Sequence, residues 1–248
     1  MKKVLLSAVL IVLATAKFAS AQTLDDITFY TEEYPPYNFT ENGRLTGIAT
    51  EILEIAFKKH NTKKGVNDII LADWDVGYQA VLKGPNAAIY TMTKTDARTP
   101  LFKWAGPIAP NTLDVFARKD RNFSVGSEND LKRLRIAVVL NDVGHVKARE
   151  LGVPEENFIA RQTVQENFAD LEAGRADVWI YGRGTGYYLM RKAGIVDKYE
   201  DVLNLLRSAF FVGFSLDVDD KIVEDIQEVI DEVKIDGTLD RIMAKYLN

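Results

Sequence analysis

The sequence predicts an α/β protein with mostly parallel sheets, because strand-like and helix-like runs alternate from one end of the chain to the other. A second observation is that this order contains no repeat, low-complexity tract or long linker. A third is the complete absence of cysteine, so no disulfide framework is available and the fold must rely on its apolar core.

The individual elements follow from short apolar runs and from helical spacing. Ile48, Ile52, Ile55 and Ala56, for example, share one helical face. Strands are predicted at 27–31, 68–72, 86–91, 112–119, 134–140, 176–181 and 209–216. Helices are predicted at 47–60, 76–84, 144–152, 163–175 and 185–194.

Two further helices are predicted in the C-terminal tail. Asp219 and Asp220 can cap the first of them, Gly237 ends it, and Thr238 starts the second. The first helix carries an apolar stripe formed by Ile222, Ile226, Val229, Ile230 and Val233. Such a stripe predicts one face buried against the rest of the protein.

Residues 1–21 are predicted to be a secretory signal peptide. Lys2 and Lys3 precede a short apolar run, and Ala19, Ser20 and Ala21 give the small residues of a cleavage site. The alternative is an uncleaved membrane anchor. Removing this segment leaves 227 residues and changes the formal net charge from −5 to −8, because the segment carries three lysines and no acid. With no cysteine to accept a lipid, we expect a periplasmic protein free in solution.

Composition argues against several classes of partner and cofactor. The acidic chain has no basic block, which disfavours nucleic acid and anionic membrane surfaces. His60 and His145 are the only histidines, so a zinc site of the usual kind is not expected. A nucleophile elbow, a phosphate loop and a dinucleotide fingerprint are missing. We therefore expect no metal, no cofactor and no catalytic residues.

A polar cluster follows the predicted strand 86–91. Thr91 and Thr93 place their hydroxyls on one face of the strand, and Thr95 can cap a short turn that ends before Pro100. Arg98 would project from this turn, where a guanidinium can grip a carboxylate with two hydrogen bonds. Ligands of open α/β sheets bind at the carboxyl ends of strands. The alternative is a surface arginine beside ordinary strand threonines.

Aromatic residues follow two other predicted strands. Tyr34, Tyr37 and Phe39 surround two prolines, and Trp74 stands just ahead of a helix. Two aromatic planes at one rim could enclose a small ligand, although each residue alone could equally be part of the core.

Together these motifs resemble the bacterial extracellular solute-binding protein family 3, the polar amino-acid binders of ABC importers. The resemblance covers nearly the whole chain after residue 21. It is carried, in order, by YPPYNF with GRLTGIATEIL, DWDVGYQAVLKG, MTKTDAR with FKWAGPI, LEAGRADVWIY and DGTLDRIMAKYL.

The resemblance implies the periplasmic binding protein type II fold, in which two α/β lobes are joined by two hinge crossings and close on a ligand. Lobe 1 would comprise 22–115 and 209–248, and lobe 2 would comprise 116–208. The polar break near 116–130 and the segment 204–210 are the expected crossings.

The resemblance also implies roles for lobe 1 residues. Arg98 matches the arginine that holds the ligand's α-carboxylate, and Thr91 and Thr93 match the small polar groups beside it. Tyr34 and Trp74 match the aromatic residues that flank the ligand's side chain.

In lobe 2 the chain departs from the family pattern at two places. Asp142 and Val143 stand at the helix start that usually completes the carboxylate site with backbone N–H groups and hydroxyls. Gly182 stands where amino-acid binders usually carry an aspartate that pairs with the ligand's ammonium. Asp142 could take over the ammonium, and Arg183 could reach the cleft, so the resemblance implies a carboxylate ligand more firmly than an α-amino acid.

The leading hypothesis is a monomeric periplasmic protein that captures a small polar carboxylate and delivers it to an inner-membrane ABC permease. One alternative is an enzyme of the same fold, such as a cyclohexadienyl-type dehydratase, with Glu33, Asp142 or Glu166 as acid or base if buried. The other is a ligand-sensing partner of a membrane receptor.

Overall fold

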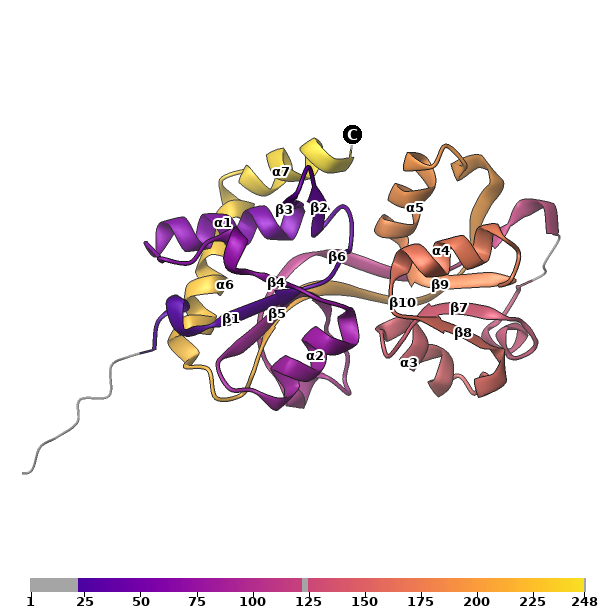
Figure 1. Cartoon of the computed structure of the whole chain (residues 1–248), viewed down its shortest axis with the longest axis horizontal. Helices are drawn as coiled ribbons and strands as arrows, with labels where there is room; N and C mark the ends of the chain where they lie inside the picture. The colour runs from indigo at the N-terminus through magenta and orange to yellow at the C-terminus, as the bar shows by residue number, and fades with distance from the viewer. Residues whose placement is uncertain (1–21, 122–124, 248) are drawn as a thin grey trace, which may run out of the picture.

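The structure is a computed structural model that describes residues 22–121 and 125–247, so the predicted signal peptide lies outside the described residues. It consists of two α/β lobes placed side by side and crossed by two long strands (Figure 1). Within the part of the chain that the structure describes, no helix has both the length and the apolarity that a membrane crossing needs.

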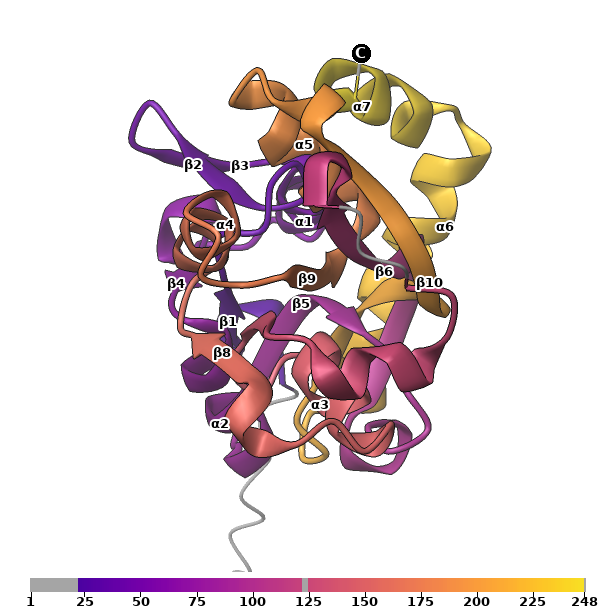
Figure 2. The same cartoon turned by 90° about the vertical axis from the view of Figure 1, so that its right-hand side faces the viewer.

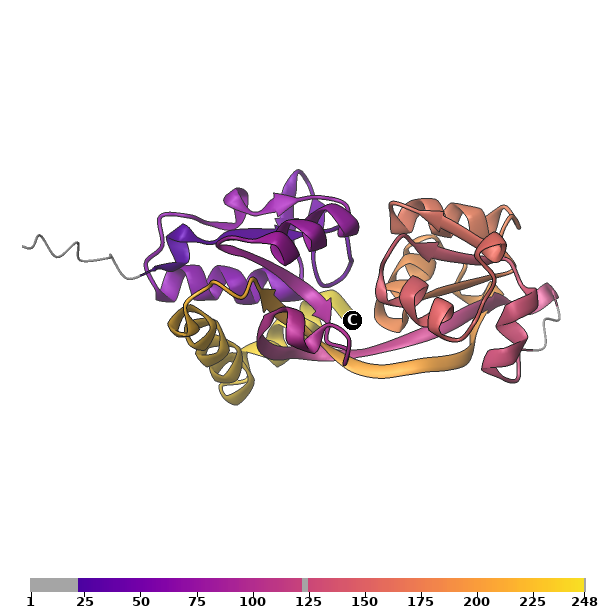
Figure 3. The same ribbon diagram turned by 90° about the horizontal axis from the view of Figure 1, so that it is seen from below.

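The two crossing strands are β6 (Lys103–Arg118) and β10 (Tyr199–Phe214). They pair antiparallel along their whole length, from Lys103 opposite Phe214 to Arg118 opposite Tyr199. Figure 3 shows both strands running from one lobe to the other. They join the lobes into one eight-stranded sheet with the order β4-β1-β5-β10-β6-β9-β7-β8.

Lobe 1 contains three parallel strands beside the antiparallel β10. These strands are β1 (Thr28–Thr31), β4 (Ile70–Leu71) and β5 (Ala87–Thr93). A separate hairpin is formed by β2 (Phe39–Glu41) and β3 (Arg44–Thr46). The helices are α1 (Ile48–Lys59), α2 (Trp74–Lys83), α6 (Asp220–Ile235) and α7 (Thr238–Leu247). Helices α1, α6 and α7 pack on one another, and α2 packs on β1 and β5.

Lobe 2 repeats this plan with three parallel strands beside the antiparallel β6. The strands are β7 (Ile136–Val139), β8 (Phe158–Arg161) and β9 (Val178–Gly182). The helices are α3 (Val143–Glu150), α4 (Val164–Glu172) and α5 (Arg183–Lys192).

Alternate residues of β9 point to opposite faces of the lobe 2 sheet. Val178 and Ile180 pack in the cluster that includes Ala148 of α3. Trp179 and Tyr181 pack in the other cluster, which includes residues of α4 and α5. Figure 2, which faces lobe 2, accordingly shows α3 and α5 on opposite sides of β9.

Helix α6 shows how sequence pattern becomes packing. All five residues of its predicted apolar stripe are buried, and Asp219 occupies the N-cap position, although its side chain makes no capping hydrogen bond. The helix ends before Gly237, whose φ of 74° lies in the left-handed region that glycine adopts most easily.

The crossing strands are longer than the sequence predicts. Strand β6 begins at Lys103 instead of 112, and β10 begins at Tyr199 instead of 209. Pro107 and Pro110 break the strand pattern of β6 because proline lacks the backbone N–H that a ladder uses. The predicted lobe boundaries at 115 and 209 fall inside these two strands and stay predictions.

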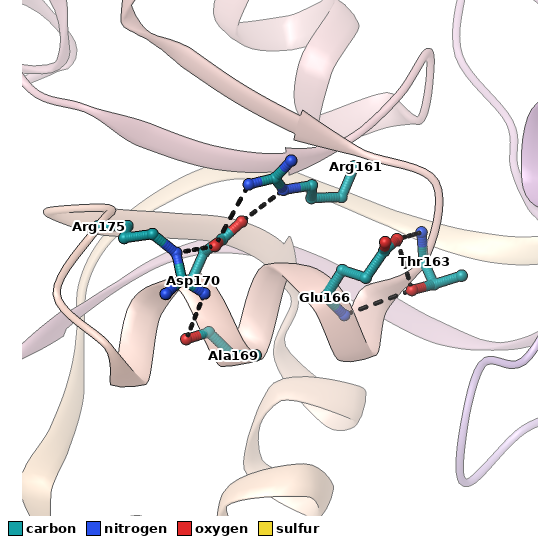
Figure 4. A network of polar contacts seen from close by, with 6 residues as sticks. All are labelled: Arg161, Thr163, Glu166, Ala169, Asp170 and Arg175. Carbon is teal, nitrogen blue, oxygen red and sulfur yellow. Dashed lines mark hydrogen bonds and ion pairs between the residues drawn. The ribbon is translucent and has the colours of Figure 1, made fainter.

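Asp170 anchors α4 within lobe 2. Its side chain is only 2% exposed and forms ion pairs with Arg161 of β8, at 2.6 Å, and with Arg175 after α4 (Figure 4). The hydrogen bond from Arg161 is the main cause that holds the pKa of Asp170 below its ordinary value. The carboxylate therefore ties one helix to an edge strand and to the turn that leads into β9.

We expect Asp170→Asn to lower the free energy of unfolding by about 1–3 kcal/mol at pH 7, because hydrogen bonds to a buried charge are lost. Since the folded-state pKa is lowered, this contribution is complete above the unfolded pKa of about 4 and is lost as pH falls through the folded value. Urea unfolding at pH 7 and pH 3 measures both effects.

The control is Asp197→Asn, because Asp197 is an exposed aspartate in the same lobe. Its unfolding midpoint should match that of the unaltered protein. Equal midpoints for the Asp170 and Asp197 variants at pH 7 would show that the ion pairs contribute nothing.

Candidate ligand-binding site

The candidate residues gather where strand ends of the two lobes face each other. Glu32 follows β1, Trp74 begins α2 after β4, and Arg98 follows β5 in lobe 1. Asp142 follows β7 and Gly182 ends β9 in lobe 2. The parallel strands of both lobes thus deliver polar residues from their carboxyl ends, the edge at which α/β sheets bind ligands.

Arg98 is held firmly at this edge. Thr95 shapes the turn before it, since the Arg98 backbone N–H donates to the Thr95 hydroxyl at 3.3 Å. Arg98 as a whole is 6% exposed, and its Nη1 donates to the carbonyl of Thr93 at 3.2 Å. The guanidinium carbon lies 5.0 Å from the ring centroid of Trp74 and 5.2 Å from that of Tyr78. Cation–π attraction to two rings fixes the direction of the charge.

The Trp74 side chain contacts Arg98 and lobe 2, whereas its sequence position suggested that it would flank a ligand. Its ring lies against Arg98, and its Nε1 donates to the carbonyl of Asn141 in lobe 2 at 3.1 Å. Asn141 in turn donates from Nδ2 to Asp75 of α2 at 3.0 Å. These two hydrogen bonds join the lobes directly. A role for Trp74 in flanking a ligand stays a prediction.

Thr91 is a strained residue inside β5. Its φ of 61° is unusual for a β-branched residue, and it lies beside the register shift between β5 and β10. Its buried hydroxyl has no hydrogen-bond partner within the described structure. By contrast, the hydroxyl of Thr93 accepts from Nδ2 of Asn111 at 3.0 Å. Strain and an unpartnered polar atom at a strand end are features that functional sites retain.

Asp142 caps helix α3 from within the interlobe region. It is 7% exposed, and its Oδ1 accepts from the Val143 backbone N–H at 2.6 Å. Burial raises the pKa of Asp142, against the opposing effect of Arg98. The Asp142 carboxylate thus accepts the hydrogen bond from the Val143 N–H that the family resemblance assigns to a ligand carboxylate. A direct role of Val143 in ligand binding stays a prediction.

Gly182 and Gly184 make room for two tyrosines of lobe 1. A Cβ added at Gly182 would lie 2.0 Å from the hydroxyl oxygen of Tyr34, and one at Gly184 would lie 2.7 Å from that of Tyr37. The Tyr34 ring also packs on Tyr181 with a centroid distance of 5.0 Å. The space beside Gly182 is therefore filled by a phenol from the opposite lobe, and the correspondence of this position to the aspartate of amino-acid binders stays a prediction.

Arg183 pairs with two acids of the crossing strands. Its guanidinium bridges Asp114 of β6, at 3.0 Å, and Asp201 of β10, at 2.8 Å. Asp114 is fully buried and also accepts from Nδ2 of Asn204 at 2.6 Å. Arg183 thus clamps the two crossing strands. It also lines a pocket with Tyr37 and Leu247 of lobe 1, so a role of Arg183 in the cleft stays a prediction.

Glu32 is the charged residue that sequence reasoning missed. Its pKa is raised well above the ordinary value, first by burial and then by Asp142, against the opposing effect of Arg98. The rule that placed Arg98 at a strand end applies equally to Glu32, which directly follows β1. Glu32 and Glu33 are both half-buried. Glu33 accepts hydrogen bonds from the Thr40 backbone N–H at 3.0 and 3.1 Å, whereas the Glu32 carboxylate accepts none from the residues that the structure describes.

A cavity of about 200 Å³ opens beside Glu32 and is lined by both lobes. Lobe 1 contributes 32–33 and 71–74, and lobe 2 contributes 162–165. Thr163 and Glu166 form the capping box at the start of α4 near this cavity (Figure 4). Glu166 takes part in that cap. Of Glu33, Asp142 and Glu166, the three acids considered for an enzyme, Asp142 is the buried one.

No group of three His, Asp or Glu side chains suited to a metal ion occurs within residues 22–121 and 125–247. The polar groups that the site does offer are hydrogen-bond donors from Arg98 and acceptors from Glu32 and Asp142. Such a set can bind a small dipolar molecule, and two closing lobes can exclude water from it.

Two α/β lobes, two crossing strands and polar strand ends that face each other define the solute-binding class of protein, with the architecture of periplasmic binding proteins. The chain belongs to the bacterial extracellular solute-binding proteins, family 3, whose sequence profile matches residues 27–248.

Individual relatives are distant but cover most of the chain. The chain is 27% identical over 221 residues to the probable amino-acid-binding protein YxeM of Bacillus subtilis, covering 86% of this chain and 80% of that protein. It is 24% identical to a probable histidine-binding protein of Campylobacter jejuni, covering 86% and 81%. A substrate-binding protein of an ABC uptake transporter from Streptococcus pneumoniae, solved with bound histidine, superposes with a TM-score of 0.79 at 19% identity, covering 90% and 92%. At that identity the superposition shows the shared fold.

We expect Gly182→Ala to destabilise the contact between the lobes by about 1–3 kcal/mol, because the added methyl group overlaps the Tyr34 hydroxyl. The backbone itself tolerates alanine, since the φ of Gly182 is −60°. Small-angle X-ray scattering should report a larger radius of gyration.

The double variant with Tyr34→Phe removes the overlapping oxygen and should recover most of the compact form. A compact Gly182→Ala protein with an unchanged radius of gyration would contradict this account of the contact.

Proposed function

We propose that this protein captures a small polar carboxylate, an amino acid or a related acid, between its lobes and delivers it to an inner-membrane ABC permease. In this proposal residues 1–21 direct export, and the remaining chain works in the periplasm as a monomer without a lipid anchor. The observation that carries the proposal is the Arg98 guanidinium, which is enclosed at the strand edge between the lobes.

The surroundings of Arg98 support a carboxylate as its partner. The guanidinium has five N–H donors, and the Nη1 donation to Thr93 accounts for one of them. The rings of Trp74 and Tyr78 hold it in one orientation. A preoriented guanidinium loses little freedom when it forms two parallel hydrogen bonds to a carboxylate.

We assign the remaining candidate residues to the same site. The unpartnered Thr91 hydroxyl and the Thr93 hydroxyl would lie beside the ligand carboxylate. Tyr34 would cover the ligand from lobe 1, and Gly182 would admit that ring. The names of the two curated relatives, an amino-acid binder and a histidine binder, favour amino acids among small carboxylates.

Lobe closure would couple capture to delivery. The hydrogen bonds of Trp74 and Asn141 connect lobe 1 to lobe 2 in the arrangement observed here. A ligand that contacts both lobes stabilises the closed form by its difference in affinity for the closed and open forms. A permease could then recognise the closed surface.

We expect Arg98→Ala to abolish the thermal stabilisation that amino acids give to the unaltered protein. Loss of a buried, hydrogen-bonded charge pair costs about 2–5 kcal/mol, which lowers affinity by a factor of about 30 or more. A thermal-shift panel of amino acids, dicarboxylates and aromatic acids measures the effect, and native mass spectrometry identifies any molecule that co-purifies.

Arg149→Ala is the matched control, because Arg149 pairs with Glu155 on the surface of lobe 2. It should keep the full ligand response. Arg98→Lys separates charge from geometry and should bind weakly, because lysine cannot form the bidentate pair. An Arg98→Ala protein that binds as tightly as the unaltered one would refute the assigned site.

A further inference from the structure

Three charged groups from both lobes share the enclosed interlobe region without pairing with one another. Glu32 and Arg98 come from lobe 1, and Asp142 comes from lobe 2. Trp74 connects the three groups: its ring stacks on Arg98, and its Nε1 donates to Asn141, the residue before Asp142. Trp74 also lines the same cavity as Glu32. Neither carboxylate lies within the 4.0 Å ion-pair distance of the guanidinium. The positive and negative groups are thus close but separate.

Each of these groups keeps hydrogen-bonding capacity. Arg98 donates from Nη1 to Thr93, so its Nε and Nη2 remain for other acceptors. Asp142 uses Oδ1 to cap α3, which leaves Oδ2. The Glu32 carboxylate accepts no hydrogen bond from the residues that the structure describes; the Glu32 contact found there is from Nδ2 of Asn38 to its backbone carbonyl.

The sum of these charges is unfavourable between the lobes, where Arg98 and Asp142 are buried and Glu32 is half-buried. With all three groups ionised, two acids face one base, and enclosed charge without a partner is costly. The strong upward shift of the Glu32 pKa reflects that cost, with burial as its first cause. A ligand can remove this energetic cost by placing a carboxylate on Arg98 and a cationic group near both acids.

Position 182 cannot supply the missing acid. It carries no side chain, and the Tyr34 hydroxyl occupies the place of its Cβ. Tyr34 itself is neutral, because burial, Asp142 and Glu32 raise its pKa well above the ordinary value. Glu32 and Asp142 are therefore acids that the region between the lobes presents to a cation, together with Glu33 and Asp73, which line the same cavity as Glu32.

We propose that Glu32 and Asp142 together form the cation-binding half of the cleft, so that its ligand is an amino acid with a net positive charge. This inference rests on the proposed function, since it takes Arg98 as the carboxylate partner. It deepens that function by naming the ligand's charge class and by assigning Glu32 a direct role in selectivity.

Isothermal titration calorimetry with amino acids of similar length but different charge tests this selectivity. L-Arginine and L-lysine are cationic, L-glutamine is neutral, and L-glutamate is anionic and nearly isosteric with L-glutamine. We expect the tighter cationic ligand to bind at least tenfold better than L-glutamine and at least a hundredfold better than L-glutamate.

Glu32→Gln preserves shape and removes one negative charge. It should weaken binding of the cationic ligand at least tenfold and change binding of L-glutamine less than threefold. Asp142→Asn should act in the same direction, and asparagine keeps the capping function at the start of α3. Glu41→Gln, at an exposed glutamate of the β2–β3 hairpin, is the charge-matched control and should change neither affinity.

The outcomes separate this inference from the proposed function. L-Glutamate binding as tightly as the cationic ligands, or an unchanged selectivity ratio in folded Glu32→Gln and Asp142→Asn proteins, would overturn the cation site and leave Arg98 as the carboxylate partner. Unchanged binding by Arg98→Ala would overturn the proposed function instead. Failure of all four amino acids to bind the unaltered protein would overturn both. Circular dichroism confirms that each variant is folded.

Discussion

The antiparallel pairing of β6 with β10 is the constraint on which the rest of the structure depends. These two strands belong to both lobes, and each lobe adds three parallel strands to one end of the pair. Because both sets of parallel strands end toward the region between the lobes, their polar carboxyl-end residues meet there. The bridge from Arg183 to Asp114 and Asp201 holds the pair together on the lobe 2 side.

The energy that holds the lobes together is modest. The hydrogen bonds from Trp74 to Asn141 and from Asn141 to Asp75 contribute about 1 kcal/mol each. Apolar contact between Tyr34 and Tyr181 adds to them. Against these contacts stands the cost of placing the half-buried Glu32 and the buried Asp142 in the same region. Energies of this size can be reversed by a ligand that contacts both lobes.

The sequence predicted the order of the main elements, the buried stripe of α6 and the turn in which Thr95 contacts Arg98. These features depend on local periodicity and local hydrogen bonds. Pro107 and Pro110 interrupt the local strand pattern of β6 and so hid its full length. The strand that pairs with this segment, β10, is distant in sequence, so local pattern could not show the pairing. The edge strand β8 and the β2–β3 hairpin also escaped the pattern.

The candidate site was less predictable than the fold. The strand-end rule led to Arg98, but it could not tell that Trp74 would stack on this guanidinium while bonding to the opposite lobe. It could not choose between Glu32 and Glu33 either, since these neighbours differ only in the path of the loop. The ion pairs of Arg183 with Asp114 and Asp201 were not predictable from local pattern, because both partners lie far from it along the chain.

The close approach of Tyr34 to Gly182 has an evolutionary consequence. In the lobe arrangement observed here, a side chain at position 182 overlaps the Tyr34 hydroxyl, so an aspartate there would compete with the phenol for the same space. A smaller residue at position 34 would remove this conflict. We therefore expect the residues at positions 34 and 182, which lie on different lobes, to change together during evolution. The residue at position 34 then limits which side chains position 182 can carry, and so which ligands the site can bind.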